Sequence, residues 1–151
     1  PCRFIQKIGL KFAKEGDVVD AKRMLNKWKV LIPKAPIAGQ TDLSNPIRFY
    51  HEKNTIISKP GECCTESWIV AGNFDSKYEA ESFKSYLFTK IVRFLILQTV
   101  ISQDVNRKNF AFVPHLDNYD QVFSDKILKK KWKISEEEWN YIDSKILETG
   151  K

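Results

Sequence analysis

Two short motifs combine a carboxylate with a lysine two positions later, and magnesium-dependent nucleases use both of these groups. They are Asp75-Ser76-Lys77 and Asp143-Ser144-Lys145. In such enzymes clustered carboxylates hold the metal, and a lysine helps to polarise the phosphate. Asp75 and Ser76 equally suit the start of a helix, where Asp and Ser are common caps. Asp143 falls inside a helical pattern on its solvated face. The sequence favours structural roles for both motifs and leaves a degenerate nuclease using Asp75 or Asp143 as an alternative.

The other reactive side chains are isolated or unsuitably spaced. His51 and His115 stand alone, and each is better explained as a surface or structural residue. Cys63 and Cys64 are adjacent, which is too close for ordinary disulfide geometry, and they lack partners at zinc spacing. We interpret them as small buried residues beside a strand. With no glycine-rich phosphate loop and no nucleophile elbow in the sequence, we predict neither a catalytic residue nor a metal ligand.

Side chains suited to DNA gather in one irregular stretch, from Pro33 to Asn54. Pro36, Gly39 and Pro46 interrupt any regular pattern there. A connection longer than about 15 residues inside a compact domain is usually functional or disordered. The stretch offers groups for phosphates and base edges, with Tyr50 available to stack. Together with the lysine that follows the next strand, the predicted DNA-binding residues are Lys34, Gln40, Arg48, Lys53, Asn54 and Lys59.

Each of these residue types has a physical role in DNA recognition. Lysine and arginine anchor on phosphates and supply the salt-sensitive part of the affinity. Arg48 is predicted to read guanine through two hydrogen bonds, and Gln40 or Asn54 to read adenine in the same way. A second basic run, from Lys126 to Lys133, precedes a run of three glutamates that partly neutralises it. DNA contact at this second run is the less favoured interpretation, because a charge run usually marks a solvated face.

Composition agrees with a folded domain that binds an anionic partner. The chain has 151 residues, 42% of them hydrophobic and 29% charged, enough for one domain with a real core. The net charge of +6 and the pI near 9.2 favour nucleic acid as the partner. Three cysteines make no disulfide framework, and no signal peptide or lipidation motif occurs. We expect a cytoplasmic location and, since the chain begins at Pro1, an excised fragment of a larger protein.

One long apolar helix, from Ser76 to about Gln103, is predicted to be the scaffold. Ser76 and Glu79 form a capping box at its start. An apolar stripe follows at helical spacing, and the segment from Ile91 to Leu97 is apolar on nearly every side, as in buried helices. The uninterrupted run is too short to span a membrane. Two charges inside it, Lys90 and Arg93, are interpreted as a pair that snorkels over apolar surface or as partners for buried carboxylates, with a phosphate contact as the alternative.

The remaining pattern predicts short elements around this helix. Alternation and turn residues predict strands, and capping residues followed by 3.6-residue periodicity predict helices. We predict an α+β fold, in which a small mixed β-sheet packs around one long central helix (about 76–104) and two short C-terminal helices follow. The predicted strands are 3–12, 27–32, 55–58, 66–71 and 110–113; the other predicted helices are 18–26, 124–131 and 135–147.

An ordered series of short motifs resembles the C-terminal region of type II restriction–modification proteins, chiefly those with an adenine-specific DNA methyltransferase. The likeness covers roughly residues 27 to 147. The motifs are Lys27-Trp28-Lys29-Val30, Lys59-Pro60-Gly61-Glu62-Cys63-Cys64-Thr65-Glu66, Phe74-Asp75-Ser76, Tyr86-Leu87-Phe88-Thr89-Lys90, Arg93-Phe94-Leu95, Phe112-Val113-Pro114, Ser124-Asp125, Ile134-Ser135-Glu136-Glu137-Glu138 and Tyr141-Ile142.

The resemblance implies a target-recognition domain that follows a methyltransferase domain, and sometimes a nuclease. Its partners would be double-stranded DNA and the catalytic domain or domains of the parent chain, where S-adenosylmethionine would bind. Phe123 stands where that family usually has Trp, and residues 117–122 replace a segment that usually contains Ser-Lys-Pro. The methyltransferase motifs are missing, so the resemblance supplies no catalytic residue. The second alternative is a docking domain whose exposed aromatics, such as Trp132, Trp139 and Tyr141, bind the rest of the parent chain.

Overall fold

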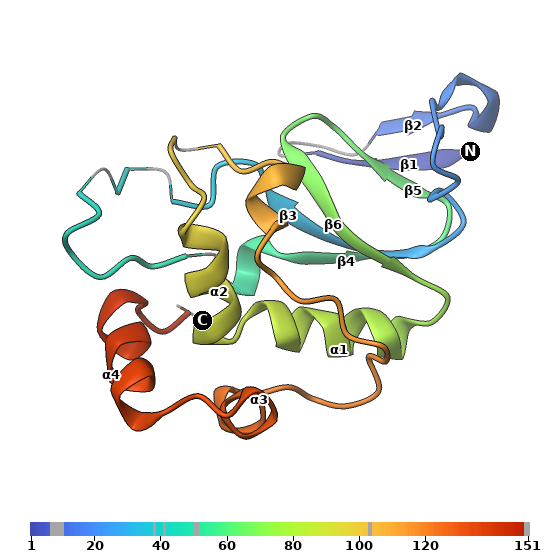
Figure 1. Ribbon diagram of the computed structural model, residues 1–151. Coiled ribbons are helices and arrows are strands. Elements are labelled where there is room, and N and C mark those ends of the chain that lie inside the picture. Colours follow the sequence, from blue (N-terminus) through green and yellow to red (C-terminus); the bar gives the residue numbers. More distant parts are fainter. Residues whose placement is uncertain (7–10, 38, 41, 50–51, 103, 150–151) are drawn as a thin grey trace.

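A computed structural model describes residues 1–6, 11–37, 39–40, 42–49, 52–102 and 104–149 (Figure 1). Within these ranges the chain forms two three-stranded sheets and four α-helices. The α+β class is therefore as predicted. The single sheet and the single long helix are not, and the reasons lie in contacts between segments that are distant in the chain.

The central sheet has the strand order β4-β3-β6 and is antiparallel throughout. Its strands are β3 (Trp28–Pro33), β4 (Ile56–Ser58) and β6 (Trp68–Phe74). All three were predicted, although β6 runs further than expected. The half-buried pattern predicted for β3 is wrong, because both faces are covered: Leu31 is buried on one face, Val30 on the other, and even Lys29 is only 3% exposed.

The smaller sheet has the order β2-β1-β5 and is mixed. β1 (Cys2–Ile5) pairs antiparallel with β2 (Lys11–Ala13) and parallel with β5 (Glu62–Cys64). The prediction of one strand over residues 3–12 is wrong, because the chain reverses between β1 and β2. Ile8 and Leu10, which contributed to the predicted alternation, lie outside the described residues. In Figure 1 this sheet lies at the upper right, with the central sheet between it and the first helix.

Two helices replace the predicted long one: α1 (Lys77–Leu87) and α2 (Lys90–Leu97). The capping box at Ser76 and Glu79 is confirmed. The break comes at Thr89, whose hydroxyl donates to the Tyr86 carbonyl (2.8 Å) and accepts from the Val92 amide (3.3 Å). The Asp125 carboxylate then accepts from the first amides of α2, those of Lys90 and Ile91 (3.1 and 3.0 Å). These caps satisfy donors that a continuous helix would have bonded internally.

Two further predictions fail because side chains bond to nearby backbone instead of extending a regular element. Residues 18–26 form turns and not a helix, since the Asp20 carboxylate accepts from the Met24 and Leu25 amides (2.7 and 2.9 Å). The strand predicted at 110–113 is absent. The 3₁₀-helix η3 (Arg107–Phe110) reaches into these residues, and Asn106 and Asn109 form a capping box at its start. Asn and Asp offer the backbone such local alternatives to helix and sheet.

The two C-terminal helices are confirmed as α3 (Asp125–Trp132) and α4 (Glu136–Lys145), with the predicted capping box at Ser135 and Glu138. Together with α1 and α2 they bury the main core against the central sheet. No helix in the described part of the chain is long and apolar enough to cross a membrane. Fully buried members of the core are Val30, Ile32, Phe49, Ala80, Tyr86, Val92, Ile96, Val105 and Leu128.

Candidate nucleic-acid interface

The stretch from Pro33 to Lys59, hereafter the arm, is irregular up to β4, as predicted, and its base is fixed to the core. Ile37, Ile47 and Phe49 are buried in the core cluster. Residues 42–46, between them, are exposed. In Figure 1 the arm lies at the left, beside α2 and above α4. The structure therefore presents an exposed tip on two anchored ends. Tyr50 and His51 lie outside the described residues.

The arm is joined to the segment that follows α4. Ile47 and Ile146 form a parallel β-bridge. The Ile47 amide donates to the Lys145 carbonyl, and the Leu147 amide donates to the Ile47 carbonyl, both at 2.9 Å. These two backbone hydrogen bonds hold the arm at Ile47 against the segment that follows α4.

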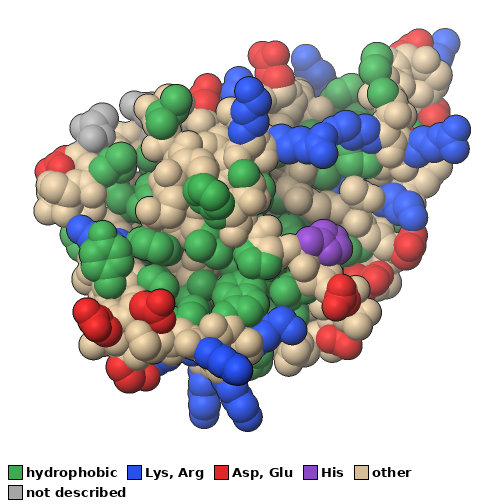
Figure 2. All heavy atoms as spheres, viewed as in Figure 1, with side chains coloured by type: hydrophobic (Ala, Val, Ile, Leu, Met, Phe, Trp, Pro, Cys, Tyr) green, Lys and Arg blue, Asp and Glu red, His purple; other side chains and the backbone are tan. Residues whose placement is uncertain are grey.

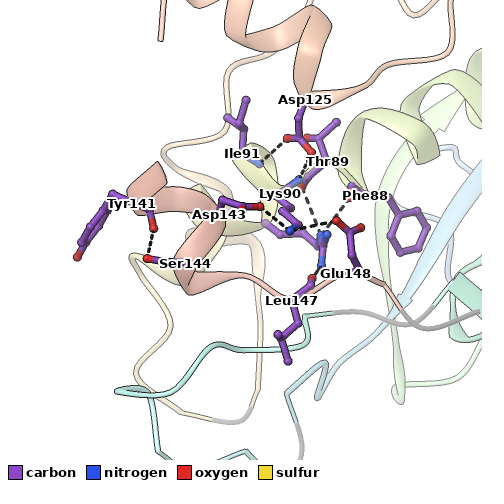
Figure 3. Close-up of polar contacts among 11 residues, drawn as sticks. Phe88, Thr89, Lys90, Ile91, Asp125, Tyr141, Asp143, Ser144, Leu147 and Glu148 are labelled. Carbon is purple, nitrogen blue, oxygen red and sulfur yellow. Dashed lines mark hydrogen bonds and ion pairs between the residues drawn. The ribbon is translucent and has the colours of Figure 1, made fainter. Parts of the chain in front are cut away.

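Arg93 makes the deepest polar contacts with the arm, and Figure 3 labels three of its other partners, Phe88, Thr89 and Leu147. Its side chain is 1% exposed, and Nη1 donates to the carbonyls of Phe49 (3.2 Å) and Leu147 (2.8 Å). Nε donates to the carbonyls of Phe88 and Thr89, which end α1. Burial lowers the pKa of Arg93 to about 10, and Asp125 and Glu148 oppose the shift, so the guanidinium is charged at neutral pH.

Lys90 lies beside Arg93 and is also engaged within the protein. Its Nζ reaches Asp143 Oδ1 (2.6 Å) and Glu148 Oε1 (3.0 Å). Lys90 is therefore paired with carboxylates as predicted, although both carboxylates are exposed and not buried. Arg93 differs from the prediction, because its hydrogen bonds go to backbone carbonyls. The alternative phosphate contact is wrong for Arg93, because a phosphate cannot reach a fully buried guanidinium.

Gln40 and Arg48 are brought together across the arm. The Gln40 amide donates through Nε2 to the Arg48 carbonyl (2.7 Å), and its Oε1 accepts from the Arg48 amide (2.8 Å). In this arrangement both polar ends of Gln40 are used, so it is not free to read adenine. It instead fixes the backbone from which the exposed Arg48 side chain leaves. No carboxylate among the described residues pairs with that guanidinium.

The tip of the arm carries a negative charge as well. The Asp42 carboxylate accepts from the Ser44 hydroxyl (2.5 Å), the Ser44 amide (3.0 Å) and Asn45 Nδ2 (2.6 Å). The hydrogen bonds from Ser44, chiefly the one from its hydroxyl, lower the pKa of Asp42. Asp42 therefore orders the tip through these three hydrogen bonds.

The other predicted DNA-binding residues are exposed but do not form one cluster. Lys34 follows β3 and pairs with Asp104 at 3.7 Å. Lys53 and Asn54 lie in the 3₁₀-helix η2 (Glu52–Asn54). Lys59 follows Ser58, which is paired with Lys29 at the start of β3. Five residues of a strand separate the two ends, roughly 17 Å. Lys34 and Lys59 therefore cannot serve one phosphate.

Additional cations, missed from the sequence, lie near Lys34. The Val105 amide donates to the Lys34 carbonyl (2.7 Å), which brings Arg107 and Lys108 of η3 to this end of β3. Both are exposed. Figure 2 shows Lys and Arg side chains across the upper right of the visible face. The sequence shows these two cations only as part of a polar loop, because they are about 70 positions away from Lys34 in the chain.

The lysine run on α3 is partly engaged. Lys129 pairs with Glu136 (3.0 Å) and lies over the Trp139 ring (4.9 Å from the centroid). Figure 2 shows Lys and Arg side chains projecting at the bottom, where Figure 1 places α3. The exposed lysines of this run are Lys126, Lys130, Lys131 and Lys133.

The nuclease alternative gains no geometric support. Asp75 pairs with Lys27, and Asp143 pairs with Lys90. Among the described residues no group of three or more His, Cys, Asp or Glu side chains is placed to hold a metal ion. Cys63 and Cys64 lie in β5 as free thiols, half-buried, and burial raises the pKa of both. A raised pKa leaves a thiol less reactive.

The aromatics of the docking alternative differ in exposure. Trp132 and Trp139 are half-buried and pack against the core. Tyr141 is 58% exposed, with its ring edge-on to Phe94 at 5.9 Å. Of the three, Tyr141 is the one whose surface is available to another domain.

Comparison of the chain with protein-family models, with curated proteins and with solved structures gives no match.

Proposed function

We propose that the chain is a DNA target-recognition domain of a restriction–modification protein and contributes no catalytic residue of its own. The observation that carries the proposal is the exposed Arg48 guanidinium, on an arm anchored by buried residues and fixed by Gln40. The net charge of +6 supports it, as does the ordered series of motifs that resembles adenine-specific methyltransferase proteins. A fixed backbone matters because it restricts the positions that the Arg48 side chain can reach, and a base contact discriminates best when the side chain that makes it is held in place.

In this proposal Arg48 enters the major groove and donates two hydrogen bonds to guanine. Lys34, Lys53 and Lys108 lie outside the groove and set the register on phosphates. Asn54 remains a candidate for adenine. S-adenosylmethionine and the methyl transfer belong to the rest of the parent protein, which would dock against the domain, with Tyr141 as one available contact. The location would be cytoplasmic.

The test is binding of the 151-residue chain to a set of duplexes that differ at single positions, at several salt concentrations. We expect a dissociation constant of about 10⁻⁴–10⁻⁶ M near physiological salt, with steep salt dependence. Arg48→Ala should relax preference at one base position by about 1–3 kcal/mol. Lys53→Ala, the matched phosphate variant, should weaken all duplexes equally. No binding even at low salt refutes the proposal, and an equal loss on all duplexes with Arg48→Ala refutes the base contact.

A further inference from the structure

A second candidate site lies between β6, α1 and the segment that follows η3. It is a pocket of about 510 Å³. Five successive β6 residues, Ile69 to Asn73, line one side. Among the described residues β6 is at the edge of its sheet, since the strand order is β4-β3-β6, so its outer backbone N–H and C=O groups face no described strand. The pocket is in the size range of small-molecule and cofactor sites.

The opposite wall of the pocket is aromatic and held in place. The rings of Phe83 and Tyr119 meet edge-on at 5.2 Å. The Tyr86 ring, 5.9 Å from that of Tyr119, is fully buried and supports this wall from within the core. The Tyr86 hydroxyl donates to the Pro114 carbonyl (2.7 Å), and the Tyr119 oxygen accepts from the Leu116 amide (3.3 Å). His115 adds a ring 6.0 Å from Tyr119. A wall of fixed rings is suited to a planar apolar group.

The charges at this pocket are all of one sign. Lys22 and Arg107, both exposed, line it together with His115, and no Asp or Glu is among its described lining residues. Four other pockets of the described chain each include at least one carboxylate, such as Glu81, Asp20, Glu136 or Glu62. The combination of a cationic edge and an aromatic wall is complementary to a planar molecule that carries an anion.

We propose that this pocket binds a nucleotide, with the base between the aromatic wall and the β6 edge and the phosphate between Lys22 and Arg107. The outer backbone groups of β6 supply hydrogen-bond partners for the edge of the base, as proteins use for unstacked bases. The choice of a nucleotide over other planar anions rests on the proposed DNA-recognition function. The nucleotide can come from solution or from a strand in which one base is unstacked, and the two sources share the same chemistry.

The probes are deoxyadenosine monophosphate, followed by titration calorimetry, and a single-stranded oligonucleotide with a central 2-aminopurine, followed by its fluorescence. Lys22→Ala/Arg107→Ala removes the two cations. Lys11→Ala/Lys14→Ala is the control, with the same change of charge at exposed residues that do not line the pocket. We expect the pocket variant to bind at least one probe about tenfold or more weakly, since hydrogen bonds to charged groups contribute that much, and the control to bind as the wild type does.

A second variant, Ala71→Leu, fills the pocket from β6 without changing charge and should abolish binding of the same probe. If the Ala71→Leu variant does not fold, the Lys22→Ala/Arg107→Ala variant still tests the pocket, because it changes only exposed residues. Binding of the oligonucleotide alone assigns the source to a strand, and binding of both probes assigns the pocket to free nucleotides as well. Failure of both probes, or equal weakening in the Lys11/Lys14 control, overturns the proposal. Neither outcome touches duplex binding through Arg48, which is measured separately.

Discussion

At the scale of single residues, the Arg93 side chain joins several separate segments of the chain. One buried guanidinium serves carbonyls from three separate segments: the end of α1, the arm at Phe49 and the C-terminal segment at Leu147. The planar fork of arginine can donate in several directions at once, which lysine cannot do. The sequence marked Lys90 and Arg93 only as a basic pair on one helix face. Their partners were hidden because Phe49 and Leu147 are distant in the chain.

Arg93→Met should lower the free energy of unfolding by about 3 kcal/mol, because several buried carbonyls lose their donor and two carboxylates lose a nearby cation. Urea denaturation measures the change. Lys130→Met is the control, since that lysine is exposed and should shift stability by less than about 0.5 kcal/mol. A loss below about 1 kcal/mol for Arg93→Met would mean that water replaces the guanidinium.

At the scale of elements, the junction between α1 and α2 depends on Asp125, a residue from the start of α3. Periodicity in the sequence is continuous across the junction and predicted one helix over 76–104. The local capping signal at Thr89 is short, and the second cap arrives from 35 positions away. Burial raises the pKa of Asp125, although the amides of Ile91 and Lys90 and the nearby Arg93 act in the opposite direction.

This junction makes stability depend on pH with a defined sign. Above the ordinary value of 3.8 and below its raised folded pKa, Asp125 holds a proton that the unfolded chain has released. The free energy of unfolding therefore falls as pH rises through that interval. Asp125→Asn keeps an acceptor but does not titrate there. Denaturation at a series of pH values should show the wild type losing stability relative to the variant as pH rises from about 4; a constant difference contradicts the raised pKa.

At the scale of the whole molecule, the structure consists of a packed core and an arm whose tip contributes little to that core. Gln40→Ala removes both hydrogen bonds to Arg48. We expect the Arg48 amide to exchange with deuterium about tenfold faster, while the thermal midpoint moves by no more than about 4 °C. Asn54→Ala, an exposed change in the same arm, is the control. A midpoint loss as large as that of Arg93→Met would show that the arm and the core unfold together.

Local signals predicted well and long-range ones did not. The capping boxes at Ser76 and Ser135 are properties of neighbouring residues, and both are confirmed. The position of β3 is confirmed as well, although its predicted half-buried pattern is wrong. The strand at 3–12 and the unbroken helix failed because contacts outside the window decided. The helix at 18–26 failed locally, because the Asp20 side chain bonds to the amides of Met24 and Leu25. For the candidate interface the sequence supplied exposed residue types but could not show that Gln40 is already engaged. The pocket beside β6 had no sequence signal, because its lining runs from Lys22 to Tyr119.

The bridge between Ile47 and Ile146 also sets an order of events during protein synthesis. Its two residues are 99 positions apart, so the arm leaves the ribosome before α3 and α4 have been translated and cannot form the bridge until they have been. Until then Phe49 and Ile47 have no complete core to enter, and they are accessible to chaperones. Slow codons or a pause before residue 146 would lengthen that vulnerable period.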